Sequence, residues 1–250
     1  MFIDLNVPLS GPDEDAFGVA ERLEMLGRLG YRGAALAETV TAAPGAHRTP
    51  PNTAARIDTL RASCPPDLTV HSRLDVVVED MSSAQAIVAG PAAASFDVLA
   101  ARPTTDRLLQ QCCASLDVDV ISLDLAQRSV PKLRPKDAAE AVRRGVRFEI
   151  CYAPALRSQV ARRNVFVNSR LLVRAAGSRG VVLSSGAASA MDVRAPHDVV
   201  NMATVMGVDA RWGKPALSGT CAELLLRRSR RRRTDASGAV EMDVDARFDA

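Results

Sequence analysis

Short apolar segments alternate with stretches of helical periodicity along most of the chain. The first segment, FIDLNV at 2 to 7, predicts a strand, and apolar positions from Ala16 to Leu29 then recur at helical spacing. Gly30 follows where the end of a helix favours a residue with positive φ. The same pattern predicts six more strands, at 33 to 39, 69 to 78, 96 to 101, 118 to 124, 147 to 152 and 181 to 184. Helices are predicted at 53 to 62, 82 to 89, 104 to 115, 136 to 144 and 158 to 176.

The apolar content of the strands favours a parallel sheet. VDVISLD and VVLSS are nearly continuous apolar runs, which is typical of strands buried on both faces by helices. Seven such strands alternating with helices predict a TIM-like distorted barrel with surrounding helices. Two more helices are predicted after the last strand, at 196 to 207 and from Lys214 onward. We expect one domain over 1 to 226 and a flexible tail, basic and then acidic, over 227 to 250.

Length and composition fit a single large core. The chain has 250 residues, of which 47% are hydrophobic. It contains no apolar run of 18 residues, and acids stand near its start where a signal peptide would be basic, so we expect neither a membrane span nor secretion. The five cysteines lack CxxC spacing and lie mostly in apolar segments, which is typical of buried thiols in a reducing compartment. The three histidines are too far apart in sequence to suggest a zinc site.

Charge is concentrated at one end of the chain. The formal net charge is only +3, and residues 1 to 226 carry 25 basic and 24 acidic side chains. RRSRRRR at 227 to 233 then places six arginines in seven positions. Three interpretations are open for Arg227, Arg228, Arg230, Arg231, Arg232 and Arg233: RNA binding, a nuclear localisation signal, or solubility of a helix end; we favour nuclear import. Arginine outnumbers lysine 29 to 3, which reflects either a preference for phosphate contacts or a coding bias.

The carboxyl ends of the strands are the place to look for catalysis in a parallel barrel. The polar candidates there are Asp4, Asn6, Glu38, Asp75, Asp124, Glu149, Ser184 and Ser185. They could form an acid/base pair or a magnesium site, but such residues also serve as caps and as partners of arginine. One alternative is therefore a metal-dependent phosphoesterase or hydrolase that uses Asp4, Glu38, Asp124 and Glu149.

Other sequence features argue against that enzyme. The first strand contains no histidine, which a di-metal phosphoesterase centre would need there, and the GxSxG and GxxxxGK[ST] motifs are absent. His71 lies within an apolar segment and is expected to be a hydrogen-bonded structural residue. His197 follows Pro196 in a first helical turn, where we expect it at the surface.

Several segments resemble a known family in their order along the chain. They are LDVDVISLDLAQRSVPKLRP (116 to 135), RRGVRFEICYAPALR (143 to 157), RRNVFVNSRLLVRAA (162 to 176), VVLSSGA (181 to 187) and VRAPHDVVNMATVMGVD (193 to 209). Together they resemble the thirty-kilodalton protein subunit of ribonuclease P and ribonuclease MRP. FIDLNVP and ALSGTCAELL extend the resemblance over most of 1 to 226, whereas GPAAAS at 90 to 95 lacks the basic residues that family members often carry there.

The resemblance implies a fold, a function and a set of partners. The fold would be a barrel related to the PHP phosphoesterases but without their metal histidines. The chain would be a non-catalytic subunit that supports RNA-catalysed 5′ maturation of precursor tRNA and pre-rRNA processing in the nucleus and nucleolus. It would hold no cofactor, with magnesium on the RNA subunit. Its partners would be the catalytic RNA, precursor tRNA through the particle, and a small α/β protein subunit. A protein-interaction barrel without an RNA role stays open as a third alternative.

RNA affinity comes mainly from basic side chains that neutralise phosphates. The candidates are Lys132, Arg134 and Lys136 after the fifth strand, and Arg157, Arg162 and Arg163 after the sixth. Because the two groups follow consecutive parallel strands, we expect them on one rim of the barrel. The competing interpretation is a solvated surface of ordinary arginines.

Overall fold

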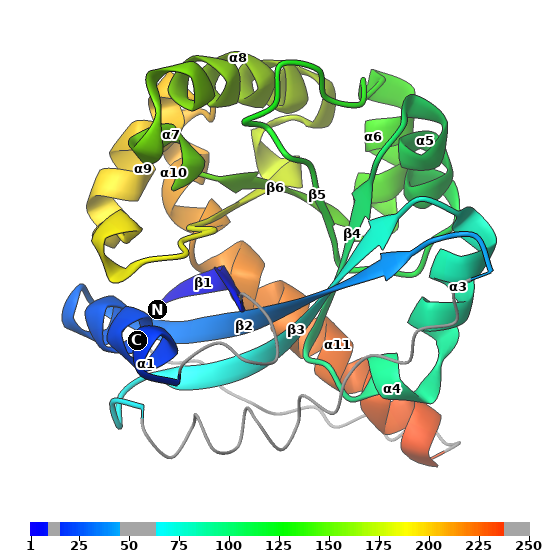
Figure 1. The fold of residues 1–250 in the computed structure, drawn as a ribbon, viewed down its shortest axis with the longest axis horizontal. Helices are drawn as coiled ribbons and strands as arrows, with labels where there is room; N and C mark the ends of the chain where they lie inside the picture. Colours follow the sequence, from blue (N-terminus) through cyan, green and yellow to red (C-terminus); the bar gives the residue numbers. More distant parts are fainter. Residues whose placement is uncertain (10–15, 46–63, 238–250) are drawn as a thin grey trace.

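A computed structural model describes residues 1–9, 16–45 and 64–237. Seven parallel strands lie side by side in the order of the sequence, each paired with the next (Figure 1). They are β1 (Phe2–Pro8), β2 (Tyr31–Ala42), β3 (Thr69–Val78), β4 (Val98–Pro103), β5 (Val120–Ser122), β6 (Arg147–Cys151) and β7 (Val181–Ser184). The amide of Gly186, just after β7, donates to the carbonyl of Asn6 in β1 at 3.0 Å, which brings the two edges of the sheet together. The result is a nearly closed TIM-like barrel.

Helices surround the barrel. They are α1 (Ala16–Arg28), α3 (Met81–Ala89), α4 (Pro91–Ala94), α5 (Asp106–Ala114), α6 (Pro135–Arg143), α7 (Pro154–Arg157), α8 (Gln159–Ala176), α9 (Pro196–Val205), α10 (Ala210–Ala216) and α11 (Gly219–Ser237), with 3-10 turns η1 (Ser178–Gly180) and η2 (Ala190–Asp192). No helix in the described ranges is long and apolar enough to cross a bilayer. All five cysteines are free thiols, and Cys112, Cys113 and Cys221 are buried.

The seven predicted strands are confirmed, and so is the positive φ of Gly30, at 94°. The helix predicted over 158 to 176 is confirmed as α8, and Ser158 is its extended N-cap, accepting from the amide of Val160 at 3.2 Å. That cap separates the short helix α7 from α8. The helix predicted at 53 to 62 lies outside the described residues.

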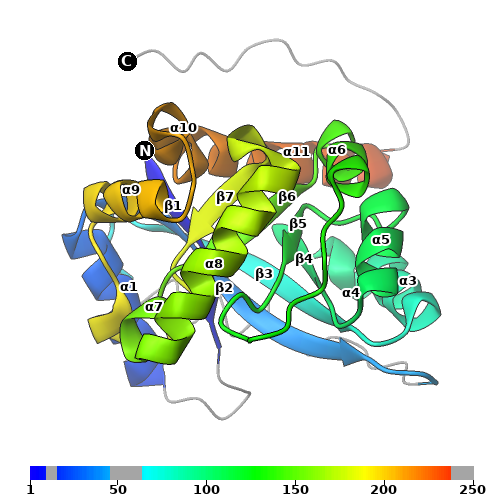
Figure 2. The same ribbon diagram turned by 90° about the horizontal axis from the view of Figure 1, so that it is seen from above.

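The interior of the barrel is divided into an apolar half and a polar half. Inward-facing side chains of five strands form a small apolar cluster that also includes Cys221 and Leu224 of α11: Ile3, Leu5, Ala35, Val98, Ala100, Val120 and Val182. Figure 2 shows α11 lying across one end of the barrel, opposite the end where α7 and the loop between β5 and α6 are found. Helix α11 therefore closes the amino end of the barrel, and the polar half opens at the carboxyl end.

The predictions for the C-terminal part need correction. The helix expected from Lys214 is two helices, because α10 ends at Ala216 and α11 begins at Gly219. Residues 227 to 237, expected to be a flexible tail, continue α11 to Ser237. Arg228 is buried, and its guanidinium donates to the carbonyls of Ala93 at 2.9 Å and Phe96 at 3.4 Å. The helix extends past 226 because its next turn packs on the barrel wall; residues 238 to 250 are outside the described ranges.

Candidate nucleic-acid interface

The carboxyl end of the barrel holds a group of polar side chains that we call the barrel mouth: Asp4, Asn6, Arg73, Asp75, Arg102 and Glu149. All but Arg102 are buried, and they come from β1, β3, β4 and β6. Side chains alternate between the two faces of a strand, so Arg73 and Asp75 point inward together. Alternation thus places the two charges of β3 together, and Glu149 of β6 meets Arg73 inside the barrel.

Arg73 is the centre of the barrel mouth. Its Nε donates to Asp75 Oδ1 at 2.6 Å, and its Nη1 and Nη2 bind the two oxygens of Glu149 at 2.5 and 2.7 Å. Asn6 Nδ2 also donates to Glu149 Oε2, at 3.0 Å. Burial by itself would raise the pKa of Glu149, but the Arg73 guanidinium outweighs it and holds that pKa well below its usual range. Glu149 is consequently a charged structural partner of Arg73.

Asp4 lies beside this network, and its pKa is shifted in the opposite direction from that of Glu149. Its Oδ1 accepts from the amides of Ser185 at 2.9 Å and Asn6 at 3.1 Å, whereas its Oδ2 is buried with no hydrogen-bond partner in the described part of the chain. Burial raises the pKa of Asp4 to about 6, although the bonds from Ser185 and Asn6 oppose that shift. A carboxyl with one unpartnered buried oxygen is better suited to the protonated form than to the charged one.

The four carboxylates of the alternative enzyme are not assembled. Glu149 is bound to Arg73, and Asp124 lies in an exposed turn where it accepts from the amide of Ala126 at 3.2 Å. Glu38 is on the face of β2 shared with Leu36 and Val40, outside the barrel interior. Among the residues that the structure describes, no three His, Cys, Asp or Glu side chains are placed to hold a metal ion. Residues of the barrel mouth therefore do not fit a metal centre.

His71 and His197, the two histidines considered in the sequence, each lie beside another side chain. His71 Nδ1 lies 3.9 Å from Asp97 Oδ2, near the start of β3 and away from the barrel mouth. His197 is exposed at the start of α9 and packs edge-on against the ring of Phe2, with 5.5 Å between ring centroids. Both observations agree with the expected structural and surface placements.

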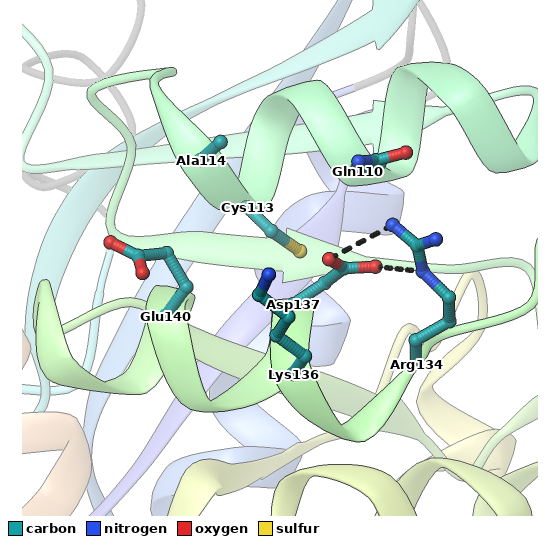
Figure 3. Close-up of a pocket in the computed structure, with 7 residues that line it drawn as sticks. All are labelled: Gln110, Cys113, Ala114, Arg134, Lys136, Asp137 and Glu140. Carbon is teal, nitrogen blue, oxygen red and sulfur yellow. Dashed lines mark hydrogen bonds and ion pairs between the residues drawn. The ribbon is translucent and has the colours of Figure 1, made fainter.

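The first predicted basic group lies at the start of α6. Lys132, Arg134 and Lys136 are all exposed, and the backbone amide of Lys132 donates to Asp106 Oδ1 at 2.9 Å, which ties this loop to α5. Arg134 forms a two-bond ion pair with Asp137, at 2.6 and 3.1 Å. A pocket of about 450 Å³ lies between α5 and α6 (Figure 3), and its lining residues are Gln110, Cys113, Ala114, Arg134, Lys136, Asp137 and Glu140. The acids in this pocket neutralise part of its positive charge.

The second predicted basic group lies at α7 and the start of α8. Arg157 pairs with Asp192 of η2, with Nη2 and Nε at 2.5 and 3.0 Å from Oδ2. Arg162 donates from Nε to the carbonyl of Ala155 at 2.8 Å and so fixes α7 against α8. Arg163 is exposed and forms no ion pair within the described ranges. Of the three, Arg163 is the one whose whole guanidinium is available to a phosphate.

Helix α8 joins the two groups. Asn164 Nδ2 donates to the carbonyl of Ala126 at 2.8 Å, and Asn168 Nδ2 donates to those of Leu125 and Gln127 at 2.9 and 3.0 Å. These bonds hold the loop after β5 against α8, on the barrel end where α7 also lies (Figure 2). Lys132 lines a groove with Arg174 and Ala175 near the end of α8, whereas Arg162 and Arg163 lie in its first turns, so the two groups flank α8 and the expected shared rim is not found. We refer to Lys132, Arg134, Lys136, Arg157, Arg162 and Arg163 together as the basic rim.

Two exposed arginines near the basic rim were missed in the sequence. Arg128 belongs to the same loop as Lys132, and Arg107 directly follows the Asp106 that binds this loop. Strand order could have pointed to Arg107, because the residues after β4 share a barrel end with those after β5 and β6. Arg73 and Arg102 of the barrel mouth were also missed.

Part of the arginine run is structural. Besides buried Arg228, the guanidinium of Arg227 lies against Gly145, whose φ is +83° and where a Cβ would meet Arg227 Nη1 at 2.2 Å. The glycine that ends α6 makes room for this side chain. Arg227 and Arg228 accordingly belong to the packing of α11, and only Arg230 to Arg233 are left as candidates for a localisation or RNA-binding segment.

The geometry defines a class of protein: a TIM-like barrel whose mouth is filled by an arginine network and whose outer end carries basic side chains suited to a polyanion. The family model described as RNase P subunit p30 matches residues 1–233. The chain belongs to this family of ribonuclease P protein subunits.

Individual relatives agree with the family. The chain is 32% identical over 241 residues to the probable ribonuclease P protein subunit 3 of Schizosaccharomyces pombe, covering 94% of this chain and 96% of that protein. It is 32% identical over 165 residues to the ribonuclease P/MRP protein subunit RPP1 of Saccharomyces cerevisiae, covering 66% of this chain and 55% of RPP1. Mouse ribonuclease P protein subunit p30 is 28% identical over 158 residues, covering 63% and 59%. The chain thus spans nearly the whole fission-yeast relative and a little over half of the other two.

Solved structures agree on the fold. A chain in the structure of archaeal ribonuclease P with mature tRNA superposes with a TM-score of 0.70 at 15% identity, covering 98% of this chain and 97% of that one. Histidinol phosphate phosphatase from Lactococcus lactis, in a complex with zinc, L-histidinol and phosphate, gives a TM-score of 0.51 at 13% identity, covering 82% and 92%. The predicted relationship to a PHP-type phosphatase barrel is confirmed at the level of fold.

Proposed function

We propose that this chain is a non-catalytic protein subunit of ribonuclease P, and of ribonuclease MRP, which supports RNA-catalysed 5′ maturation of precursor tRNA and pre-rRNA processing. The observation that carries the proposal is family membership over residues 1–233 together with a barrel mouth that is filled by Arg73. Glu149 and Asp75 of the barrel mouth are bound to arginine, and we assign hydrolysis to the RNA. Magnesium would be held by that RNA, and the chain itself would carry no cofactor.

The basic rim is the proposed contact with the catalytic RNA. Lys132, Lys136 and Arg163 are exposed and have no ion-pair partner among the described residues, so they can meet phosphates without giving up an existing bond. Arg134 and Arg157 already bind carboxylates and would have to share their guanidinium groups. Precursor tRNA would be met through the assembled particle.

The outer face of α8 is the proposed contact with a small α/β protein subunit. Val160, Val167 and Leu171 recur at helical spacing, and their side chains are among the most exposed large apolar ones, at 67%, 53% and 58%. Beside them, a mostly apolar groove of about 340 Å³ runs between α8 and the loop after β5, with Lys132 and Arg174 in its walls. An apolar protein surface with acidic residues at its edge fits this groove.

The subunit assignment is tested by recovering the tagged chain from cells and sequencing the accompanying RNA. We expect the RNA of ribonuclease P, that of ribonuclease MRP, and the other protein subunits. Recovery of proteins without structural RNA would favour the protein-interaction barrel. Chelator-sensitive cleavage of generic phosphodiesters by the purified, RNA-free chain would favour the metal-dependent hydrolase instead.

The chain is proposed to act in the nucleus and nucleolus, with Arg230 to Arg233 as the import signal. Replacing these four arginines by glutamine in a fluorescent fusion should move the protein to the cytoplasm. Unchanged nuclear fluorescence would assign import to another segment or to a partner subunit.

A further inference from the structure

The barrel mouth contains a full positive charge that is completely removed from water. Arg73 has 0% exposure, as do Asp75 and Glu149, and its guanidinium uses four bonds to reach three strands. The fourth bond runs from Nη1 to the carbonyl of Leu5 in β1 at 2.8 Å. One side chain of β3 therefore binds β1 and β6 across the interior.

The carboxylates of the barrel mouth need a cation. Two ionised carboxylates in a barrel interior cost a large desolvation free energy unless a positive charge compensates them, and either a metal ion or an arginine can do so. Here the oxygens are already used: Glu149 Oε1 and Oε2 bind Arg73, and Oε2 also binds Asn6. Asp75 binds Arg73 through Oδ1 and Arg102 through Oδ2, the latter at 2.7 Å. A metal ion would have to displace two guanidinium groups.

We infer that Arg73 is the built-in counter-ion of this barrel, a positioning residue that holds β1, β3 and β6 together and excludes a metal ion from the barrel mouth. The phosphatase of similar fold was solved in a complex with zinc, whereas the carboxyl end of this barrel holds a guanidinium bound to two carboxylates. The inference concerns the interior of the chain and does not depend on which RNA the basic rim contacts.

A charge role and a packing role for Arg73 predict different results in a double-mutant cycle. Arg73→Met keeps much of the side-chain volume and removes the charge, which leaves Glu149 buried without its cation. Glu149→Gln then removes the uncompensated charge. If compensation is the role, the double variant is more stable than Arg73→Met alone; if packing is the role, the two losses add.

The experiment measures the Tm of the purified full-length variants by circular dichroism. We expect Arg73→Met to lower the Tm by about 10 °C and Arg73→Met/Glu149→Gln to recover at least half of that loss. Arg144 is the matched control, because its guanidinium binds the carbonyls of Cys112, Cys113 and Leu116, so Arg144→Met/Glu149→Gln should show additive losses. If Arg73→Met does not fold, a folded double variant still supports the inference.

Two results would overturn the inference. One is a double variant that is no more stable than Arg73→Met, including the case in which neither folds. The other comes from titrating the wild-type chain with Mn²⁺: we expect no saturable rise in Tm, and such a rise abolished by Glu149→Gln would show that the barrel mouth takes a metal ion despite Arg73.

Discussion

Individual buried carboxyls in the barrel mouth have pKa values shifted in opposite directions because they differ in partners. Glu149 has Arg73 beside it and stays charged, whereas Asp4 has two backbone amides on one oxygen and no hydrogen-bond partner on the other among the described residues. The sequence showed both as acids in predicted strands. It could not assign them partners, since Arg73 and Glu149 are 76 positions apart and meet only when the barrel closes.

The raised pKa of Asp4 makes it a source of pH-dependent instability. The folded chain holds the Asp4 proton up to about pH 6, whereas the unfolded chain releases it near pH 3.8. The favourable contribution of Asp4 to the free energy of unfolding is therefore fully present below about pH 4 and is lost as the pH rises through 6. Asp4→Asn keeps an acceptor for Ser185 and Asn6 and has no charge to bury. We expect it to raise the free energy of unfolding by roughly 1–3 kcal/mol at pH 7, with little effect at pH 4.

Urea unfolding of both proteins at pH 4 and pH 7 checks this expectation. Asp124→Asn, in an exposed turn, is the control and should give the same small difference at both pH values. An Asp4→Asn variant that is less stable than wild type at pH 7 would mean that Asp4 is charged and compensated in the folded protein.

At the scale of elements, the sequence predicted the repeated strand and helix units well and the C-terminal helices poorly. Strands with continuous apolar runs are visible because both faces are buried. Helix α11 was cut at 226 because its composition turns strongly basic there, yet arginine is a good helix former, and Arg228 reaches the carbonyls of Ala93 and Phe96. A contact over 130 positions away gives no local signal.

Closure of the amino end by α11 predicts a sharp difference between two leucines of that helix. Leu224 is 2% exposed and packs into the barrel interior with Ile3 and Leu5, whereas Leu226 is 47% exposed. We expect Leu224→Ala to cost about 2–4 kcal/mol of unfolding free energy and Leu226→Ala under about 1 kcal/mol. Equal losses in denaturant unfolding would contradict the assigned role of α11.

The exposed apolar face of α8 predicts a loss of assembly without a loss of folding. Leu171→Asp places a charge on the proposed protein contact while the buried side of α8 stays unchanged. We expect the tagged variant to keep its Tm within about 2 °C and to recover several-fold less of the other protein subunits. Leu226→Asp, on the far end of the barrel, is the control, and equal recovery with both variants would remove α8 from the interface.

At the scale of the whole molecule, a net charge of +3 hides an uneven distribution. Several acids inside and around the barrel are paired with arginines, so the charge available to a polyanion depends on the basic side chains that have no ion-pair partner in the described ranges. The sequence predicted that the two basic groups share one rim, whereas Lys132 lies near the end of α8 and Arg163 near its start. It could not tell Arg134 and Arg157, which form ion pairs, from Lys132 and Arg163, which form none within the part of the chain that the structure describes. Asp137 is a helix turn from Arg134, and Asp192 is brought close to Arg157 only by the fold.

The uneven distribution predicts that Lys132 and Arg163, one from each basic group, contact RNA independently. Lys132→Glu and Arg163→Glu should each weaken binding of the catalytic RNA several-fold near 0.1 M salt. Each should also reduce the magnitude of the slope of log K against log salt by about 1. The double variant should lower it by about 2, because the contacts are separate. Arg211→Glu/Lys214→Glu changes charge equally on exposed positions of α10, outside both basic groups, and should leave the slope unchanged. If both double variants weaken binding alike, the RNA responds to overall charge, and the basic rim has no special role in its recognition.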